Sequence, residues 1–288
     1  MRFEIASSDI TFNGSGIKPF FAHLNEVCTK FGTSYFVVGA FARDLLLENI
    51  YNQPTGVATR DIDIAITIES WQNYQEVIHF LLQKKGFRKG QNVHEYISPE
   101  NIQTDIIPYG SIEENRTVSF PPNFDTVMNM LGFQEVYKAT IQIILDDAVS
   151  FKIASIEGIA LLKFIAWADR IPDRISQKHV TDISLIIKAY FDAKVAEFAT
   201  ELPYLFDEEH FDTFICSARV LGHRFQQISK KSVQLKIELN AIFDKILKEK
   251  SNSLFLTQLT LSSNWDYAFC LRLMESLVES FRENYLPK

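Results

Sequence analysis

Three aspartates stand in two segments that have the composition of β-strands. Asp61 and Asp63 lie two residues apart in a run of apolar, largely β-branched residues, and Asp105 lies in a second such run. Side chains at positions i and i+2 of a strand project from the same face, so Asp61 and Asp63 are expected to point the same way. Carboxylates held this close repel one another, and a divalent cation relieves that repulsion. Oxygen-only ligands favour Mg²⁺ or Mn²⁺.

An Asp-x-Asp pair alone is common and usually marks the solvated edge of a strand. The aspartate in the second apolar strand favours a metal site instead, because a buried strand has no structural use for an unpaired acid. Asp61, Asp63 and Asp105 are therefore the expected catalytic and metal-binding residues.

The segment before the acids has the pattern of a strand, a tight turn and a helix. Tyr35–Val38 are strand formers, Gly39 permits the turn, and Ala40 begins a run of helix formers. The N–H groups at the start of such a helix suit phosphate. Arg43 is expected to reach the same phosphates or to be an ordinary surface residue, and Asp44 to hold Arg43 or to cap nearby N–H groups.

In order and spacing these residues resemble the DNA polymerase β-type nucleotidyltransferase superfamily. The Gly-x-x-x-Arg-Asp motif that begins at Gly39 is also similar to tRNA CCA-adding enzymes, but the later Arg-Arg-Asp motif of those enzymes is absent from the sequence. The segment 104–110 around Asp105 is most similar to the AbiEii-type nucleotidyltransferase toxin family. Ala40 replaces the second Gly or Ser of the family pattern, so a hydroxyl contact to phosphate is missing while backbone contacts remain.

A second signature of the AbiEii-type family lies in the C-terminal half of the chain. It consists of a Lys, a later Arg and a Lys-x-x-x-Asp motif, which correspond here to Lys163, Arg170, Lys178 and Asp182. His179 stands where the family more often has Asp. The resemblance implies that Lys163, Arg170 and Lys178 bind the nucleotide, together with Gly39, Ala40 and Arg43.

Residue spacing leaves alternatives open in this half. Lys163, Trp167 and Arg170 fall at i, i+4 and i+7 of a predicted helix, so Trp167 either stacks on a nucleotide or belongs to the core. Lys178 and Asp182, at i and i+4, form either a plain helix ion pair or an arrangement in which Asp182 orients Lys178 or Arg170.

The element pattern predicts an α+β protein. The resemblance implies that residues 1–153 form a polymerase β-like mixed sheet flanked by helices, and the element pattern predicts that residues 154–288 form an all-helical domain that packs against it to form a cleft. Predicted helices cover 17–31, 40–47 and 71–85, then 155–170, 176–193, 208–224, 231–250 and 264–283. Predicted strands cover 34–38 and the Asp61 segment, then a hairpin made of 86–97, a turn at 98–101 and the Asp105 strand. Further strands are predicted at 134–145 and 148–153, with Asp146 and Asp147 in the turn between them.

Composition sets limits on the class of protein. The net charge of −7 argues against broad nucleic-acid affinity, and no apolar run is long enough for a transmembrane helix. The three cysteines are odd in number and far apart, which indicates reduced thiols and a cytoplasmic protein without membrane attachment.

Together, the acids and the resemblance predict transfer of a nucleoside monophosphate from a nucleoside triphosphate to an acceptor hydroxyl, with two Mg²⁺ or Mn²⁺ ions bridged by Asp61 and Asp63. Asp105 is expected to bind the second ion and to accept the hydroxyl proton. The resemblance implies a toxin that modifies tRNA and has an antitoxin partner. Nucleotidylation of a small molecule such as an aminoglycoside and a non-catalytic nucleotide-binding regulator remain as alternatives.

Overall fold

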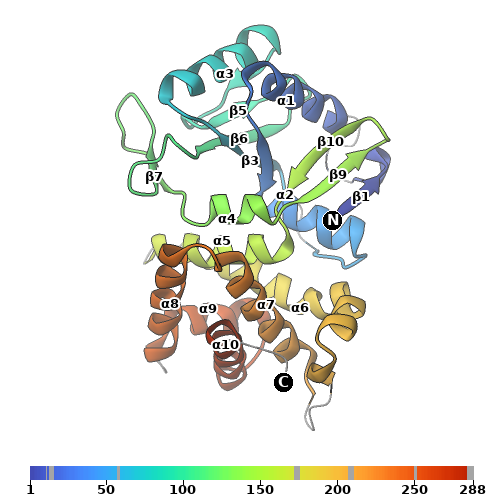
Figure 1. The fold of residues 1–288 in the computed structure, drawn as a ribbon, viewed down its shortest axis with the longest axis vertical. Helices are drawn as coiled ribbons and strands as arrows, with labels where there is room; N and C mark the ends of the chain where they lie inside the picture. Colours follow the sequence, from blue (N-terminus) through green and yellow to red (C-terminus); the bar gives the residue numbers. More distant parts are fainter. Residues whose placement is uncertain are drawn as a thin grey trace. The chain divides into compact units, whose positions relative to one another are not determined.

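The computed structural model describes residues 1–10, 12, 16–56, 59–171, 176–206, 211–249 and 252–283 (Figure 1). The chain divides into two compact units, Met1–Ser155 and Ile156–Lys288. The first unit contains the sheet and the second is helical. Each unit is described on its own below.

In the described part of the first unit, eight strands form one mixed sheet in the order β1-β9-β10-β2-β3-β6-β5-β4. Their bounds, in that order, are Arg2–Ile5, Ile141–Leu145, Val149–Ile153, Tyr35–Val38, Asp61–Thr67, Gln103–Tyr109, Glu95–Ile97 and Arg88–Lys89. A separate hairpin pairs β7 (Thr117–Ser119) with β8 (Val127–Asn129). At the centre of the main sheet, β3 runs antiparallel to β2 and parallel to β6.

The central strands alternate between buried and half-buried side chains. In β3, Ile62 and Ile64 are fully buried while Asp61 and Asp63 are partly exposed, which confirms the predicted division of the faces. One face is covered by two amphipathic helices in contact with one another, α1 (Ile17–Phe31) and α3 (Trp71–Lys84) (Figure 1). The aspartates therefore lie on the face opposite these helices.

The short helix α4 (Phe133–Lys138) covers part of the face that carries the aspartates. Its Phe133 and Tyr137 rings lie 5.6–6.3 Å from the rings of Phe36 and Tyr109. Strand register places Phe36 and Tyr109 toward the ends of β2 and β6 that lie away from the aspartates. As a result α4 covers one end of this face and the acids occupy the other.

Several sequence predictions for this unit were wrong in detail. The predicted strand 134–145 is helix α4 followed by β9, because Phe133, Val136 and Tyr137 have helical spacing and pack on the sheet together. The helix that begins at Gly39 is α2 (Gly39–Asp44) and continues as a π-helix over Leu45–Ile50. Strand β1 and the β7–β8 hairpin were missed.

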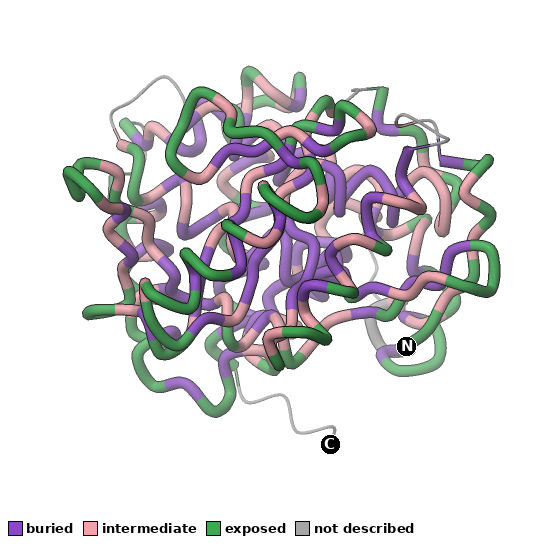
Figure 2. The backbone as a smooth tube through the Cα atoms, turned by 90° about the horizontal axis from the view of Figure 1, so that it is seen from above, coloured by how far each residue is buried: buried purple, intermediate pink, exposed green. Residues whose placement is uncertain are grey.

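The described part of the second unit is helical, as predicted. Its helices are α5 (Ile156–Asp169), α6 (Ser176–Glu201), α7 (Thr213–Ser229), α8 (Val233–Lys248), α9 (Leu254–Ser263) and α10 (Tyr267–Arg282). Helix α9 was missed, and the ends predicted at 208 and 250 lie outside the described residues. Buried aromatic rings fill the core, with Phe164 in contact with Phe225, Phe243 and Phe255. Figure 2 shows the buried stretches of chain mostly inside and the exposed stretches mostly at the periphery. The sheet unit and the helical unit confirm the predicted α+β class.

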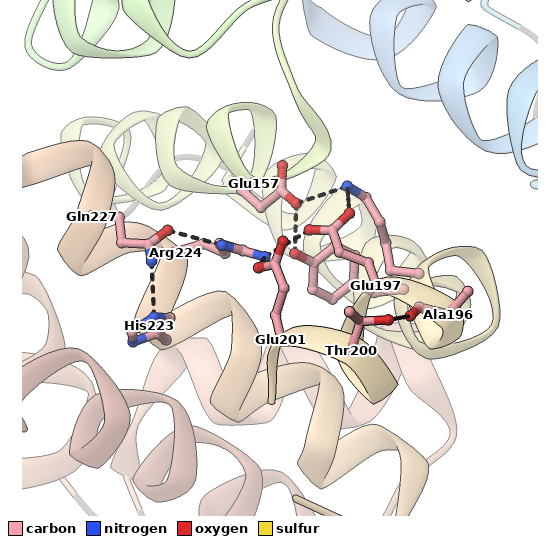
Figure 3. A network of polar contacts seen from close by, with 10 residues as sticks. Glu157, Ala196, Glu197, Thr200, Glu201, His223, Arg224 and Gln227 are labelled. Atoms are coloured by element: carbon pink, nitrogen blue, oxygen red, sulfur yellow. Dashed lines mark hydrogen bonds and ion pairs between the residues drawn. The ribbon is translucent and has the colours of Figure 1, made fainter. Parts of the chain in front are cut away.

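A network of charged and polar side chains joins α5, α6 and α7 (Figure 3). Glu157 accepts a hydrogen bond of 2.6 Å from the Tyr190 hydroxyl and lies 3.6 Å from the Lys194 ammonium. Lys194 pairs with Glu197 at 2.8 Å, and Arg224 pairs with Glu197 at 2.6 Å. Each of these acids therefore has a cation beside it.

No described helix is both long and apolar enough to cross a membrane. All three cysteines are free thiols. Burial raises the pKa of the Cys28 thiol to about 12 and that of Cys216 to about 11, which makes both thiols poor nucleophiles near neutral pH.

Candidate active site

The strand register places the predicted acids in one row across the sheet. Asp63 of β3 lies directly opposite Asp105 of the parallel strand β6, and Asp105 lies opposite Glu95 of the antiparallel strand β5. Asp61 precedes Asp63 by two residues on the same face. Paired residues on neighbouring strands have Cα atoms only about 5 Å apart. The structure therefore brings Asp61, Asp63 and Asp105 to the same end of the sheet.

Glu95 is a fourth acid of this row, and sequence reasoning missed it. Its side chain is buried, with 8% of the residue exposed, and its Oε2 accepts a hydrogen bond of 3.1 Å from the Asn92 amide. The hairpin was predicted, but its register depends on the turn after β5, and a shift of one residue would place Glu95 on the other face.

Gly39 is in direct contact with the carboxylate of Asp63. The glycine has φ +76°, and a Cβ added to it would stand 1.8 Å from Oδ2 of Asp63. Any other residue would therefore displace either the turn or the carboxylate. The sequence indicated that Gly39 lets backbone approach a ligand, and the structure shows that the backbone approaches an acid of the row.

The remaining acids have partners that hold their side chains. Asp61 accepts a hydrogen bond of 3.0 Å from the Thr59 hydroxyl, and the Nε2 atom of His94 lies 3.5 Å from Oδ2 of Asp105. Among the described residues, no three His, Cys, Asp or Glu side chains converge into a ready-made metal site. Asp61, Asp63 and Asp105 nevertheless offer carboxylate oxygens from one face, which is the donor set that Mg²⁺ and Mn²⁺ prefer.

The start of α2 follows strand β2 directly, next to the acid row. Val38, at the N-terminal cap of α2, provides no side-chain hydrogen bond to the first N–H groups of the helix. Arg43 is almost completely buried, and its Nε and Nη2 atoms lie 2.7 and 2.6 Å from Oδ1 of Asp44. Of the two expectations for Asp44, holding Arg43 is confirmed. Because a guanidinium has five N–H donors, contact with a phosphate does not require Arg43 to leave Asp44.

In the helical unit, Lys163 of α5 forms an ion pair with Asp182 of α6. Asp182 therefore pairs with Lys163, whereas the sequence indicated Lys178 or Arg170 as its partner. Lys178 and Arg170 are exposed. Burial, together with the nearby charges of Lys163 and Arg170, lowers the pKa of His179 to about 4.

Trp167 is a core residue. It is 1% exposed, and its indole N–H donates a hydrogen bond of 2.9 Å to Gln258 of α9. Its ring lies 5.0 Å from that of Phe255 in an edge-to-face contact. The alternative in which Trp167 stacks on a nucleotide is therefore wrong.

Residues 45–272 match the family model described as "Nucleotidyl transferase AbiEii toxin, Type IV TA system". The match includes the Asp61–Asp63 pair, Asp105 and the helical-unit residues Lys163 to Asp182. Comparison with curated protein sequences gives no match.

Three solved structures resemble the chain at low sequence identity. An antigenic nucleotidyltransferase-like protein from Paracoccidioides brasiliensis is 16% identical over 67% of this chain and 92% of its own, with a TM-score of 0.39. The antibiotic-resistance factor ANT(2'')-Ia is 14% identical over 67% of this chain and 96% of its own, with a TM-score of 0.36. The Thermotoga maritima CCA-adding enzyme complexed with tRNA is 14% identical over 95% of this chain and 84% of its own, with a TM-score of 0.24.

Proposed function

The chain belongs to the nucleotidyl transferase AbiEii toxin family of type IV toxin–antitoxin systems, and on that premise we propose that Asp61, Asp63 and Asp105 form its active site. The protein is a nucleotidyltransferase. The observation that supports this site is the register of β3 and β6, which sets Asp63 opposite Asp105 on the face that also carries Asp61. The reaction joins an acceptor hydroxyl oxygen to the α-phosphorus of a nucleoside triphosphate, breaks the α–β phosphoanhydride bond and releases pyrophosphate.

The donor set of the row fits divalent cations. We propose that Asp61 and Asp63 hold two Mg²⁺ or Mn²⁺ ions and that Asp105 holds one of them. When bound, the ions offset the charge of the triphosphate and lower the pKa of the acceptor hydroxyl. The close contact between Gly39 and Asp63 supports this role, because it fixes one carboxylate of the row against rigid backbone.

The protein groups around the row have the following proposed roles. Asp105 accepts the proton of the attacking hydroxyl, with His94 beside its Oδ2 atom to orient the carboxylate. The N–H groups of Gly39 and Ala40 donate hydrogen bonds to the β- and γ-phosphates. Arg43 contributes positive charge near the same backbone, from its buried position on Asp44.

In the helical unit we propose Lys163, Arg170 and Lys178 as phosphate-binding residues. Lys163 is held in place by Asp182, which fixes its ammonium group, whereas the side chains of Arg170 and Lys178 are exposed to solvent. A held lysine loses less conformational freedom when it binds phosphate than an exposed one. Lys163 is therefore expected to matter most among the three.

The family assignment supports a biological context. We propose that the protein is a cytoplasmic toxin controlled by an antitoxin and that it modifies tRNA. The net charge of −7 restricts its affinity for nucleic acid to local contacts. A small molecule such as an aminoglycoside is the acceptor to test beside tRNA.

The test is nucleotide transfer by purified protein. Each α-labelled nucleoside triphosphate is incubated with Mg²⁺ and with tRNA or an aminoglycoside, and labelled product and released pyrophosphate are measured. Asp63→Asn is expected to abolish both, and removal of the divalent cation by a chelator is expected to do the same. The matched control is Asp147→Asn, which makes the same change at an exposed turn residue that already has φ +55°. Equal activity of the two variants would refute the proposed site.

A further inference from the structure

The first unit contains a cavity that none of the roles above uses. It has a volume of about 540 Å³ and lies between α3, the loop that joins β4 to β5, and residues 120–122. This volume is typical of pockets for small organic ligands. Aromatic side chains form much of its lining, namely Trp71, Tyr74, Tyr96 and Phe120. The Trp71 and Phe120 rings pack edge to face with centroids 5.5 Å apart, so the aromatic lining is held in place.

Two residues connect this cavity to the acid row. Glu95 lines the cavity and is the strand partner of Asp105. His94 lies 3.5 Å from Asp105, and its ring centroid lies 5.5 Å from that of Phe120, which also lines the cavity. Glu95 and His94 therefore lie between the cavity and Asp105.

The Glu95 carboxylate is held in a fixed position by its neighbours. Its Oε1 atom would stand 2.5 Å from a Cβ added at Gly90, so the carboxylate lies directly against the glycine backbone. Its Oε2 atom already accepts one hydrogen bond from Asn92. A carboxylate has about four acceptor positions, so Glu95 has capacity for further N–H or O–H donors.

The charge of the lining argues against a polycationic ligand. Among the described residues that line the cavity, Glu95 is the single acid, and Lys89 lies in the same lining. A compound with several ammonium groups would find one carboxylate and a competing cation there. A neutral planar ring with a few hydrogen-bond donors fits the aromatic lining, because planar rings stack on aromatic side chains.

We propose that this cavity binds a nucleobase that carries an amino group, and that Glu95 accepts a hydrogen bond from the amino group. Carboxylates accept from exocyclic amines of bases in this way elsewhere in nucleic-acid recognition. The assignment rests on the proposed function in one respect, namely that Asp105 is the acid beside the acceptor. The base belongs either to an acceptor nucleotide or to the nucleoside triphosphate, and the experiment separates the two sources.

Binding of free nucleosides tests the cavity without catalysis. Adenosine, guanosine, cytidine and uridine are titrated into the full-length protein by calorimetry, with no triphosphate and no divalent cation. At least one of the three amino-bearing nucleosides is expected to bind, and Glu95→Gln is expected to weaken that binding at least tenfold. Trp71→Ala, at a partly exposed lining position, is expected to weaken it as well.

The matched control is Glu76→Gln, the same change at an exposed residue of α3 that does not line the cavity, and it should leave binding unchanged. Absence of nucleoside binding to the wild-type protein would overturn the proposal. Equal affinities of the wild type, Glu95→Gln and Trp71→Ala would overturn it too. Should Glu95→Gln fail to fold, as judged by its melting curve, Trp71→Ala alone decides.

Competition identifies the source of the base. A non-hydrolysable nucleoside triphosphate with Mg²⁺ is added at saturation before the nucleoside titration. Unchanged nucleoside affinity assigns the cavity to the acceptor, and loss of nucleoside binding assigns it to the triphosphate. Nucleoside binding that depends on Glu95, in a protein that transfers no nucleotide, would refute the proposed function while leaving the cavity assignment intact.

Discussion

Carboxylates gather in two regions of this molecule, and their surroundings differ. In the sheet unit, Asp61 lies beside a threonine hydroxyl, and Asp105 lies beside an imidazole. In the helical unit, Glu157 and Glu197 lie beside the ammonium of Lys194, and Glu197 also lies beside the guanidinium of Arg224 (Figure 3). The first group of acids is partly exposed at the end of a sheet face, whereas Glu157 is buried among helices.

The difference separates acids that can receive a ligand from acids that hold helices together. Carboxylates without a permanent cation beside them repel one another until a ligand brings positive charge. Carboxylates paired with lysine and arginine are already neutralised, and their hydrogen bonds fix the helices that carry them. On the proposed function, the protein uses one type of side chain for chemistry in one unit and for structure in the other.

The largest expected effect is on catalysis in the sheet unit. Asp105→Asn keeps the size of the side chain and removes its charge, so kcat/KM for nucleotide transfer should fall on the order of 10³-fold. The melting temperature should not fall, since repulsion within the row decreases. Steady-state kinetics and thermal unfolding measure the two quantities. Asp125→Asn, at an exposed loop residue, is the control, and a matching loss of activity in that control would contradict the assignment.

The reverse pattern is expected in the helical unit. Lys194→Met keeps most of the apolar stem and removes the ammonium that lies 3.6 Å from the buried Glu157 carboxylate, which should destabilise the protein by roughly 3 kcal/mol. Chemical denaturation measures the loss. In the double variant with Glu157→Gln the buried charge is also removed, so the loss should be smaller than the sum of the single losses. Additive losses would show that the two residues do not act together.

The stability of the protein should depend on pH through His179 of the helical unit. Burial lowers the pKa of His179 to about 4, while the unfolded chain has the ordinary value of about 6.5. Between these values the unfolded state binds more protons, so stability from this residue is complete above about pH 6.5 and is lost as the pH falls toward 4. The loss is at most about 3 kcal/mol. His179→Gln should flatten the stability profile in this window, and an unchanged slope would exclude His179 as its source.

The smallest effect should come from Gly39→Ala. The added methyl group collides with the Asp63 carboxylate and also requires an unfavourable φ of +76°. Relief of this overlap displaces the acid by about an ångström or more, which should reduce kcat/KM by roughly 100-fold. Gly32→Ala is a suitable control, since that glycine has φ +63° but no atom within 4 Å of an added Cβ. Gly39→Ala should lose more stability than Gly32→Ala because only its methyl group collides, and only Gly39→Ala should lose activity.

The central strands could be predicted from the sequence because apolar and acidic residues alternate along them with the two-residue period of a strand. Ile62 and Ile64 face the helices while Asp61 and Asp63 face away, and this alternation is visible in the residue types alone. Glu95 was missed because its partner on the sheet depends on the geometry of a turn. The pairing of Asp182 with Lys163 was missed because it joins two helices, whereas the sequence shows only spacing within one helix.

Other misses share a physical cause. Strand β1 pairs with β9, and the contact between Ser7 and Asp146 shows that this pairing joins segments 139 residues apart. Helix α9 is apolar on most sides, so it lacks the one-sided pattern that marks a surface helix. Trp167 was ambiguous until Gln258 of α9 was seen to accept its N–H.

The position of β1 has a consequence for synthesis of the chain. A ribosome makes β1 first, but its only described strand partner, β9, ends at Leu145. The strands that carry the acid row lie closer in the sequence. The hydrogen bond from the Thr104 hydroxyl of β6 to the Ile62 carbonyl of β3 joins residues 42 positions apart. Shorter loops close at lower entropic cost. The strands that carry the aspartates can therefore pair during translation before β9, the partner of β1, has been synthesised.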